Sequence, residues 1–124
     1  MLSGADVSRE TVREILNGIS LGKRVRVHFV GIGGVSVCSL ARLSMELGVE
    51  VSGSDMEDSP RLRELRSLGA SVKITHSAEN IRGADLVVYS HAISQDNPEL
   101  SEARRLSVPT VNRAVYLGSL MTDY

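Results

Sequence analysis

Short apolar runs alternate with amphipathic segments along almost the whole chain, and this alternation limits the choice of fold more than any other feature. Runs with the length and composition of strands lie at residues 25–30, 49–53, 71–75, 86–89 and 108–111. Helical periodicity or capping residues mark residues 8–19, 34–47, 59–69, 97–105 and 113–121. Because strands that alternate with helices form βαβ units, the sequence predicts an α/β fold, a three-layer sandwich with a mainly parallel five-stranded sheet.

The composition fits one domain that binds neither nucleic acid nor a membrane. The 124 residues are 42% hydrophobic, and 14 basic residues balance 15 acidic ones. The single cysteine, Cys38, excludes an intrachain disulfide, and three histidines without an i, i+4 pair predict no metal site. The first residues, with early acids and no apolar segment, do not resemble a secretory leader, and the sequence has no apolar run of about 20 residues, so we expect a cytoplasmic protein.

A glycine-rich loop follows the first predicted strand and precedes a predicted helix, in the stretch H-F-V-G-I-G-G-V-S at residues 28–36. Glycine allows a sharp turn and a close approach of the backbone to phosphate, and the helix beyond it offers free N–H groups. Ser36 stands where a third glycine is usual; it is small, and its hydroxyl is a further donor for phosphate.

An acidic residue follows the second predicted strand at a spacing typical of nucleotide-binding folds. Asp55 lies 24 residues after Gly31, close to the roughly 20-residue offset of an acid that binds ribose hydroxyls. The loop and the acid together predict a nucleotide or a sugar-nucleotide diphosphate as ligand. They do not distinguish NAD from UDP.

Seven blocks of sequence, in order from about residue 26 to residue 121, resemble the N-terminal domain of the Mur ligases. The blocks are H-F-V-G-I-G-G (28–34), V-S-G-S-D (51–55), L-G-A (68–70), A-E-N (78–80), A-D-L-V-V-Y-S (84–90), A-I-S-Q-D-N-P-E (92–99) and R-A-V-Y-L-G-S-L-M (113–121). The chain is most similar to the branch that joins L-alanine to UDP-N-acetylmuramate in peptidoglycan biosynthesis. The resemblance implies a Rossmann-like domain at 23–124, which binds the UDP part of UDP-N-acetylmuramate, after an N-terminal helical extension at 1–22.

The resemblance also implies a substrate-binding site without catalytic residues or metal ligands. The loop backbone would hold the pyrophosphate, the residues after the second strand would lie beside the uridine, and those after the fourth strand would line the uracil and ribose pocket. Taken by itself, Arg113 is either a contact near the ligand mouth or the hinge, or a surface charge at the start of a helix. The predicted site residues are Gly31, Gly33, Gly34, Val35, Ser36, Val37, Ser54, Asp55, Ser90, His91, Ala92, Ile93 and Arg113.

Two departures from the family pattern bear on function. The family usually has G-x-G-G-x-G-M, where this chain has Ser36 and Val37 at the last two positions. The family's ATP-binding loop, G-T-x-G-K-T, is missing, and the only Gly-Lys pair, Gly22-Lys23, precedes a strand instead of following one. We therefore expect the central ATPase and C-terminal domains to be absent from this chain, which would bind no cofactor and not be catalytic alone. The full-length ligase would use ATP and magnesium.

Two other functions remain open, and so does weak self-association. The same loop and acid fit an NAD(H)-binding regulatory or redox domain, and Ser36 fits an interaction domain that has lost its ligand. Among single residues, we expect His28 and Cys38 to be structural, and we expect the arginines at 61, 63 and 66 to form a solvated helix face. His76 and His91 are equally compatible with ligand contact and with exposure in a loop.

Overall fold

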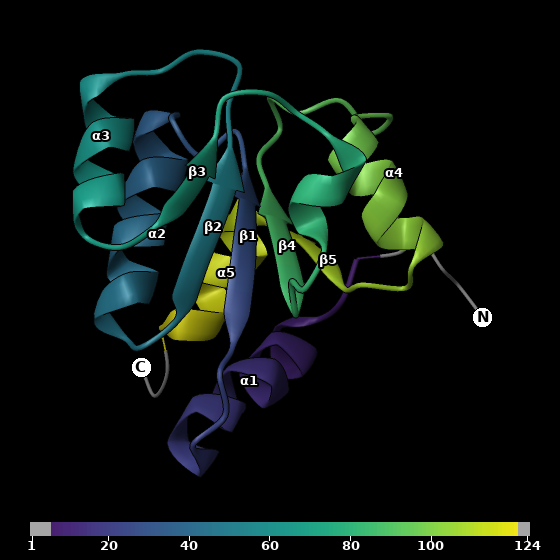
Figure 1. Cartoon of the computed structure of the whole chain (residues 1–124). Coiled ribbons are helices and arrows are strands. Elements are labelled where there is room, and N and C mark those ends of the chain that lie inside the picture. The colour runs from purple at the N-terminus through teal and green to yellow at the C-terminus, as the bar shows by residue number, and fades with distance from the viewer. Residues whose placement is uncertain (1–5, 122–124) are drawn as a thin grey trace.

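The fold is an all-parallel five-stranded sheet covered by helices on both faces (Figure 1). The computed structural model describes residues 6–121. The strand order is β3-β2-β1-β4-β5. The strands are β1 (Arg26–Val30), β2 (Glu50–Ser54), β3 (Ser71–Lys73), β4 (Leu86–Tyr89) and β5 (Thr110–Asn112). This architecture confirms the predicted α/β sandwich, and β5 lies at the edge as expected.

The helices fall into two groups according to the face of the sheet that they cover. The helices are α1 (Arg9–Asn17), α2 (Val35–Glu46), α3 (Pro60–Ser67), α4 (Pro98–Arg105) and α5 (Arg113–Leu120), with 3₁₀ turns η1 (Gly18–Leu21) and η2 (Ala78–Ile81). Side chains of α1, α2, α3 and α5 share one hydrophobic core, whereas α4 and η2 share the other (Figure 1). The strand β4 contributes to both cores and is buried throughout, as its continuous apolar sequence predicts.

The element boundaries lie within two residues of the sequence prediction, and two of the differences have a local cause in the backbone. The first helix leaves α geometry at Gly18 and ends at Gly22, whose φ of 82° is the left-handed conformation that glycine adopts easily. The edge strand starts at Thr110 because the N–H of Val108 instead donates to Ala103 O at 2.7 Å, at the end of α4. The turn η2 has no helical periodicity that could predict it.

The N-terminal helix packs on the domain. Val12 is fully buried in the larger core, and the N–H of Val7 donates to Thr110 O at 2.9 Å. The phenol of Tyr89 donates to Asp6 Oδ2 at 2.6 Å. Packing of residues 6–17 is therefore part of this fold, while the domain boundary at residue 22 stays a prediction. Within residues 6–121, no helix combines the length and the apolar character needed to cross a membrane.

Candidate functional site

A groove of about 510 Å³ lies at the carboxyl ends of β1, β2 and β4, where ligands bind in open α/β sheets. It lies between the glycine loop, the β2–α3 connection and the segment after β4. Its lining comprises Gly31, Gly33, Gly34, Val37, Asp55, Met56, Glu57, Asp58, Ser59, Arg61, His76, Ser90, Ala92 and Ile93.

The first part of the glycine loop turns sharply against β2. Gly31 has φ 76°, and a Cβ at this position would lie 2.9 Å from Ile93 Cδ1. The N–H groups of Gly31 and Ile32 both donate to the carbonyl of Ser54, at 2.8 and 3.0 Å. The loop is therefore fixed to the end of β2 before it reaches the helix.

Polar side chains bind both the N–H and the carbonyl of Gly33. Its N–H donates to Asp55 Oδ2 at 2.8 Å, and Arg61 Nε donates to its carbonyl at 3.1 Å. A Cβ on Gly33 would lie 2.7 Å from Asp55 Oδ2, so the glycine is needed for this close approach. The other carboxylate oxygen of Asp55 accepts from the N–H of Met56 at 2.8 Å. The predicted ribose-binding acid thus also fixes the loop.

The helix α2 begins directly after the loop, with Gly34 as its N-cap. The N–H of Gly34 donates to Gly31 O at 3.1 Å. The next amides, of Val35, Ser36 and Val37, are in the first helical turn, where N–H groups have no partner within the helix. With the positive end of the helix dipole, these three amides can bind an anion.

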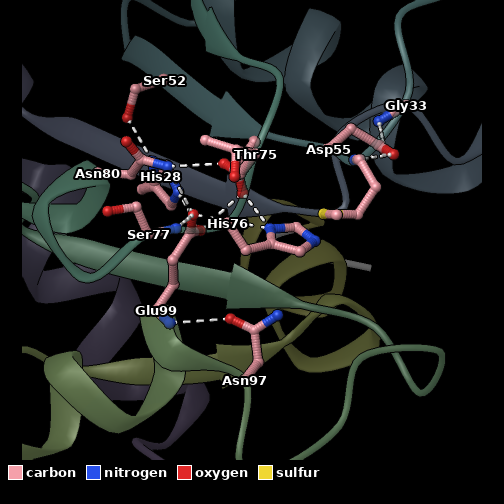
Figure 2. A network of polar contacts seen from close by, with 12 residues as sticks. His28, Gly33, Ser52, Asp55, Thr75, His76, Ser77, Asn80, Asn97 and Glu99 are labelled. Carbon is pink, nitrogen blue, oxygen red and sulfur yellow. Dashed lines mark hydrogen bonds and ion pairs between the residues drawn. The ribbon is translucent and has the colours of Figure 1, made fainter.

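Beneath the groove, a fully buried carboxylate joins four polar groups from three parts of the chain (Figure 2). Asn97 caps α4 by accepting from the N–H of Glu99 at 2.8 Å, which places Glu99 in the first turn. Glu99 Oε1 lies 2.7 Å from His28 Nε2 and accepts from Ser54 Oγ at 2.6 Å. Its Oε2 accepts from the N–H of Ser77 at 3.1 Å and from Asn80 Nδ2 at 2.8 Å.

These contacts keep Glu99 ionised. Burial raises the pKa of its carboxyl, but the hydrogen bond and charge of His28 and the hydrogen bonds of Ser54 and Asn80 outweigh burial and lower the pKa to about 2. His28 is 1% exposed, and its Nδ1 lies 2.9 Å from Ser52 Oγ. His28 is therefore structural, as predicted.

His76 connects this buried network to the groove. Its Nδ1 lies 2.9 Å from Ser54 Oγ, while its side chain is 16% exposed and lines the groove. The same nitrogen lies 3.6 Å from Glu99 Oε2. Since His76 follows β3, this second contact links the edge of the sheet to the buried carboxylate of α4.

The groove brings together eight of the thirteen predicted site residues. They are Gly31, Gly33, Gly34, Val37, Asp55, Ser90, Ala92 and Ile93. Among the other five, the side chains of Val35, Ser36 and His91 are exposed and Ser54 is buried below the groove. Arg113 is half-buried at the start of α5. For all thirteen residues, contact with a ligand stays a prediction.

Three residues with polar contacts in or below the groove, Arg61, His76 and Glu99, are not among the predicted site residues. The helical pattern predicts only a solvated Arg61; the residue is exposed but also contacts Gly33 and lines the groove. The sequence leaves His76 between two interpretations, and it marks Glu99 only as part of a helix start. The signal for Glu99 is His28, since a histidine inside a buried strand needs a polar partner.

Cys38 is partly buried against the larger core, and burial raises the pKa of its thiol. This agrees with the structural role predicted for it. A second groove, of about 570 Å³, lies beside α1 and the end of α5, and its lining includes Leu16, Ile19, Leu47, Val49 and Leu120. Because it is mainly apolar and includes no part of the glycine loop, it is not the candidate nucleotide site.

Comparison with known proteins gives one family. The model of the family described as "Mur ligase family, catalytic domain" matches residues 26–124. The UDP-N-acetylmuramate–L-alanine ligase of Sorangium cellulosum is 56% identical over 99 residues, which are 79% of this chain and 21% of that protein. The enzyme of the same name from Acetivibrio thermocellus is 45% identical over 111 residues, 90% of this chain and 24% of that protein.

Solved structures agree in fold. The UDP-N-acetylmuramate–alanine ligase of Thermotoga maritima has a TM-score of 0.72 and 39% identity, covering 76% of this chain and 22% of that one. The UDP-N-acetylmuramate:L-alanyl-γ-D-glutamyl-meso-diaminopimelate ligase of Neisseria meningitides has a TM-score of 0.67 and 27% identity, covering 73% of this chain and 29% of that one. The chain thus spans about a quarter of the length of the proteins that it matches.

Proposed function

Because the chain belongs to the Mur ligase family, we propose that it is the substrate-recognition domain of a UDP-N-acetylmuramate–L-alanine ligase, acting in the cytoplasm in peptidoglycan synthesis. Its groove would bind the UDP part of UDP-N-acetylmuramate. The observation that carries this proposal is the glycine loop, whose backbone is fixed against Asp55 at the mouth of a groove large enough for a nucleotide.

The diphosphate would bind at the start of α2. The amides of Gly33 and Gly34 already donate to Asp55 and Gly31, so the first-turn amides beyond them are the donors left for phosphate. The guanidinium of Arg61 also lines the groove and uses only its Nε for Gly33. Its terminal nitrogens would then pair with phosphate oxygens.

The nucleoside would lie on the other side of Asp55, toward the segment after β4. Ser90, Ala92 and Ile93 line this end of the groove. Together with Asp55 they offer two apolar side chains, a hydroxyl and a carboxylate, which suit the face of a base and the hydroxyls of a ribose. This arrangement supports the predicted placement of the uridine.

Substrate positioning is the part of the reaction that we assign to this chain. The whole ligase would form an amide bond with ATP and magnesium, but the sequence contains no strand–loop–helix ATP-binding motif of the G-x-x-x-x-G-K-[ST] type. Binding energy on the UDP part would hold the distant muramic carboxylate in place for chemistry carried out elsewhere in the enzyme.

Calorimetric titration with UDP-N-acetylmuramate tests the proposal, with NADH as the competing ligand. We expect the chain to bind the UDP-sugar. Arg61→Gln should weaken this binding about 3- to 10-fold through the loss of one exposed charge-assisted contact. Arg63→Gln is the matched control, since Arg63 is exposed on the same helix and is not part of the groove lining, and it should bind as the wild type does.

Binding of NADH without competition by the UDP-sugar would refute the proposal and favour the NAD(H) alternative. Equal losses in the two arginine variants would refute the placement of the diphosphate while leaving the ligand unchanged.

A further inference from the structure

His76 presents its two ring nitrogens to different surroundings. Its Nδ1 lies 2.9 Å from Ser54 Oγ and 3.6 Å from Glu99 Oε2, within the buried network. Figure 2 shows the opposite side of the ring turned away from Glu99, toward the side on which Asp55 lies. Since His76 lines the groove, Nε2 is the nitrogen available to a ligand.

The direction of each hydrogen bond in the network follows from Glu99. The backbone N–H of Ser77 and the amide nitrogen of Asn80 can only donate, so Glu99 Oε2 accepts from both. The ionised carboxylate has no proton of its own, so Oε1 also accepts, from His28 Nε2 at 2.7 Å and from Ser54 Oγ at 2.6 Å.

Ser54 transmits this direction to His76. A serine hydroxyl has one hydrogen, and the contact of Ser54 with Glu99 uses it. In the contact of 2.9 Å with His76 Nδ1, Ser54 Oγ is therefore the acceptor, and Nδ1 must carry a proton. In the neutral ring, Nε2 is then left with a lone pair.

We propose that Glu99 and Ser54 are positioning residues that hold His76 in its Nδ1-protonated form, so that Nε2 accepts a hydrogen bond from the nucleoside end of the bound ligand. Phosphate oxygens are acceptors and do not pair with such a nitrogen. The imide N–H of uracil and the O–H groups of ribose are donors and do. This contact rests on the proposed function and adds to it a residue that recognises the nucleoside.

The tautomer is tested without any ligand, by ¹H–¹⁵N NMR of the imidazole at a pH at which His76 is neutral. We expect its proton on Nδ1, the less populated form of histidine free in water. Ser54→Ala should shift the proton toward Nε2. Ser52→Ala is the matched control, because Ser52 contacts His28 and should leave the spectrum of His76 unchanged. A wild-type His76 protonated on Nε2 alone would overturn the inference.

The ligand contact is tested by titration with UDP. His76→Ala should weaken binding about 5- to 10-fold, the effect of one hydrogen bond, while Thr75→Ala, an exposed neighbour, should not. Three analogues locate the donor: UDP methylated at N3 of the base, 2′-deoxy-UDP and 3′-deoxy-UDP. The analogue that lacks the donor should bind the wild type and His76→Ala with equal affinity.

Two failures can be told apart. If the wild type and His76→Ala bind UDP with equal affinity, the proposed contact between His76 and the nucleoside is wrong, and the proposed function still stands. Wild-type protein that binds neither UDP nor UDP-N-acetylmuramate would overturn the proposed function and this contact together, while the NMR spectrum would still decide the tautomer.

Discussion

Replacing Glu99 by glutamine keeps the shape of the side chain but removes its charge and one of its two acceptor oxygens. In the wild type, both oxygens accept, from His28 and Ser54 on one side and from Ser77 and Asn80 on the other. The new side-chain amide would present a donor to one of these pairs. The side chain is fully buried, so water cannot replace the lost contacts without rearrangement.

The expected loss follows from the four contacts. A hydrogen bond to a charged group stabilises the fold by about 1.5–3 kcal/mol, and one between neutral groups by about 0.5–1.5 kcal/mol. A buried donor that faces another donor adds a cost of its own, because it has lost water without gaining an acceptor. Ser54 and His28 can reorient their protons, which recovers part of the loss. We therefore expect Glu99→Gln to lower the free energy of unfolding by about 2–4 kcal/mol, which overlaps the about 3–5 kcal/mol lost when one partner of a buried charged contact is removed outright.

Urea unfolding at pH 7, followed by circular dichroism, measures this loss. With a slope of about 2 kcal/mol per M, the midpoint should fall by about 1–2 M. Glu64→Gln is the matched control: this glutamate pairs with Arg42 on the surface, and its loss should change stability by less than about 0.5 kcal/mol. A loss of less than about 1 kcal/mol for Glu99→Gln would refute the account of the buried network.

Three further predictions concern stability. Gly53→Ala should cost about 1–3 kcal/mol in calorimetric unfolding, because its Cβ would lie 2.5 Å from Ile32 Cδ1; an unchanged melting temperature would contradict this. Because the pKa of Glu99 is about 2 in the folded protein against an ordinary 4.5, protonation favours unfolding. The stabilisation by the ionised Glu99 is present above about pH 4.5 and disappears as the pH falls toward 2. The difference in free energy of unfolding between wild type and Glu99→Gln should therefore narrow over that range. A difference that stays constant would refute the low pKa of Glu99. Tyr116→Phe should cost about 0.5–1.5 kcal/mol in urea unfolding, since the phenol lies 2.7 Å from Ser44 Oγ in the core, whereas no loss would show that this contact contributes nothing.

The parallel sheet could be predicted because it depends on local patterns. The run Leu86–Tyr89 is apolar at every position, which fits a strand covered on both faces, and its burial agrees. The order of the strands could not be predicted in this way, since β1 lies between β2 and β4 through contacts that no local pattern specifies. The 3₁₀ turns also have no periodicity of their own.

Part of the candidate site could likewise be predicted from local patterns, and part of it could not. The glycine loop and Asp55 follow strands directly, so the topology brings them to one edge of the sheet, as expected. The partners of Glu99 come from β1, β2 and the segment around η2, and only the folded chain brings them together. Asn97-Pro98-Glu99 has the sequence of a helix start, and that local explanation conceals the buried role of the carboxylate.

Binding of UDP-N-acetylmuramate in the groove is the central claim, and an amide ¹H–¹⁵N NMR titration of the chain tests it most directly. With this ligand, we expect shifts at Gly34, Val35 and Ser36 of the loop and at Ile93 across the groove, and none with NAD. Shifts confined to the apolar groove around Leu16 and Leu120, or shifts produced by NAD alone, would contradict the claim.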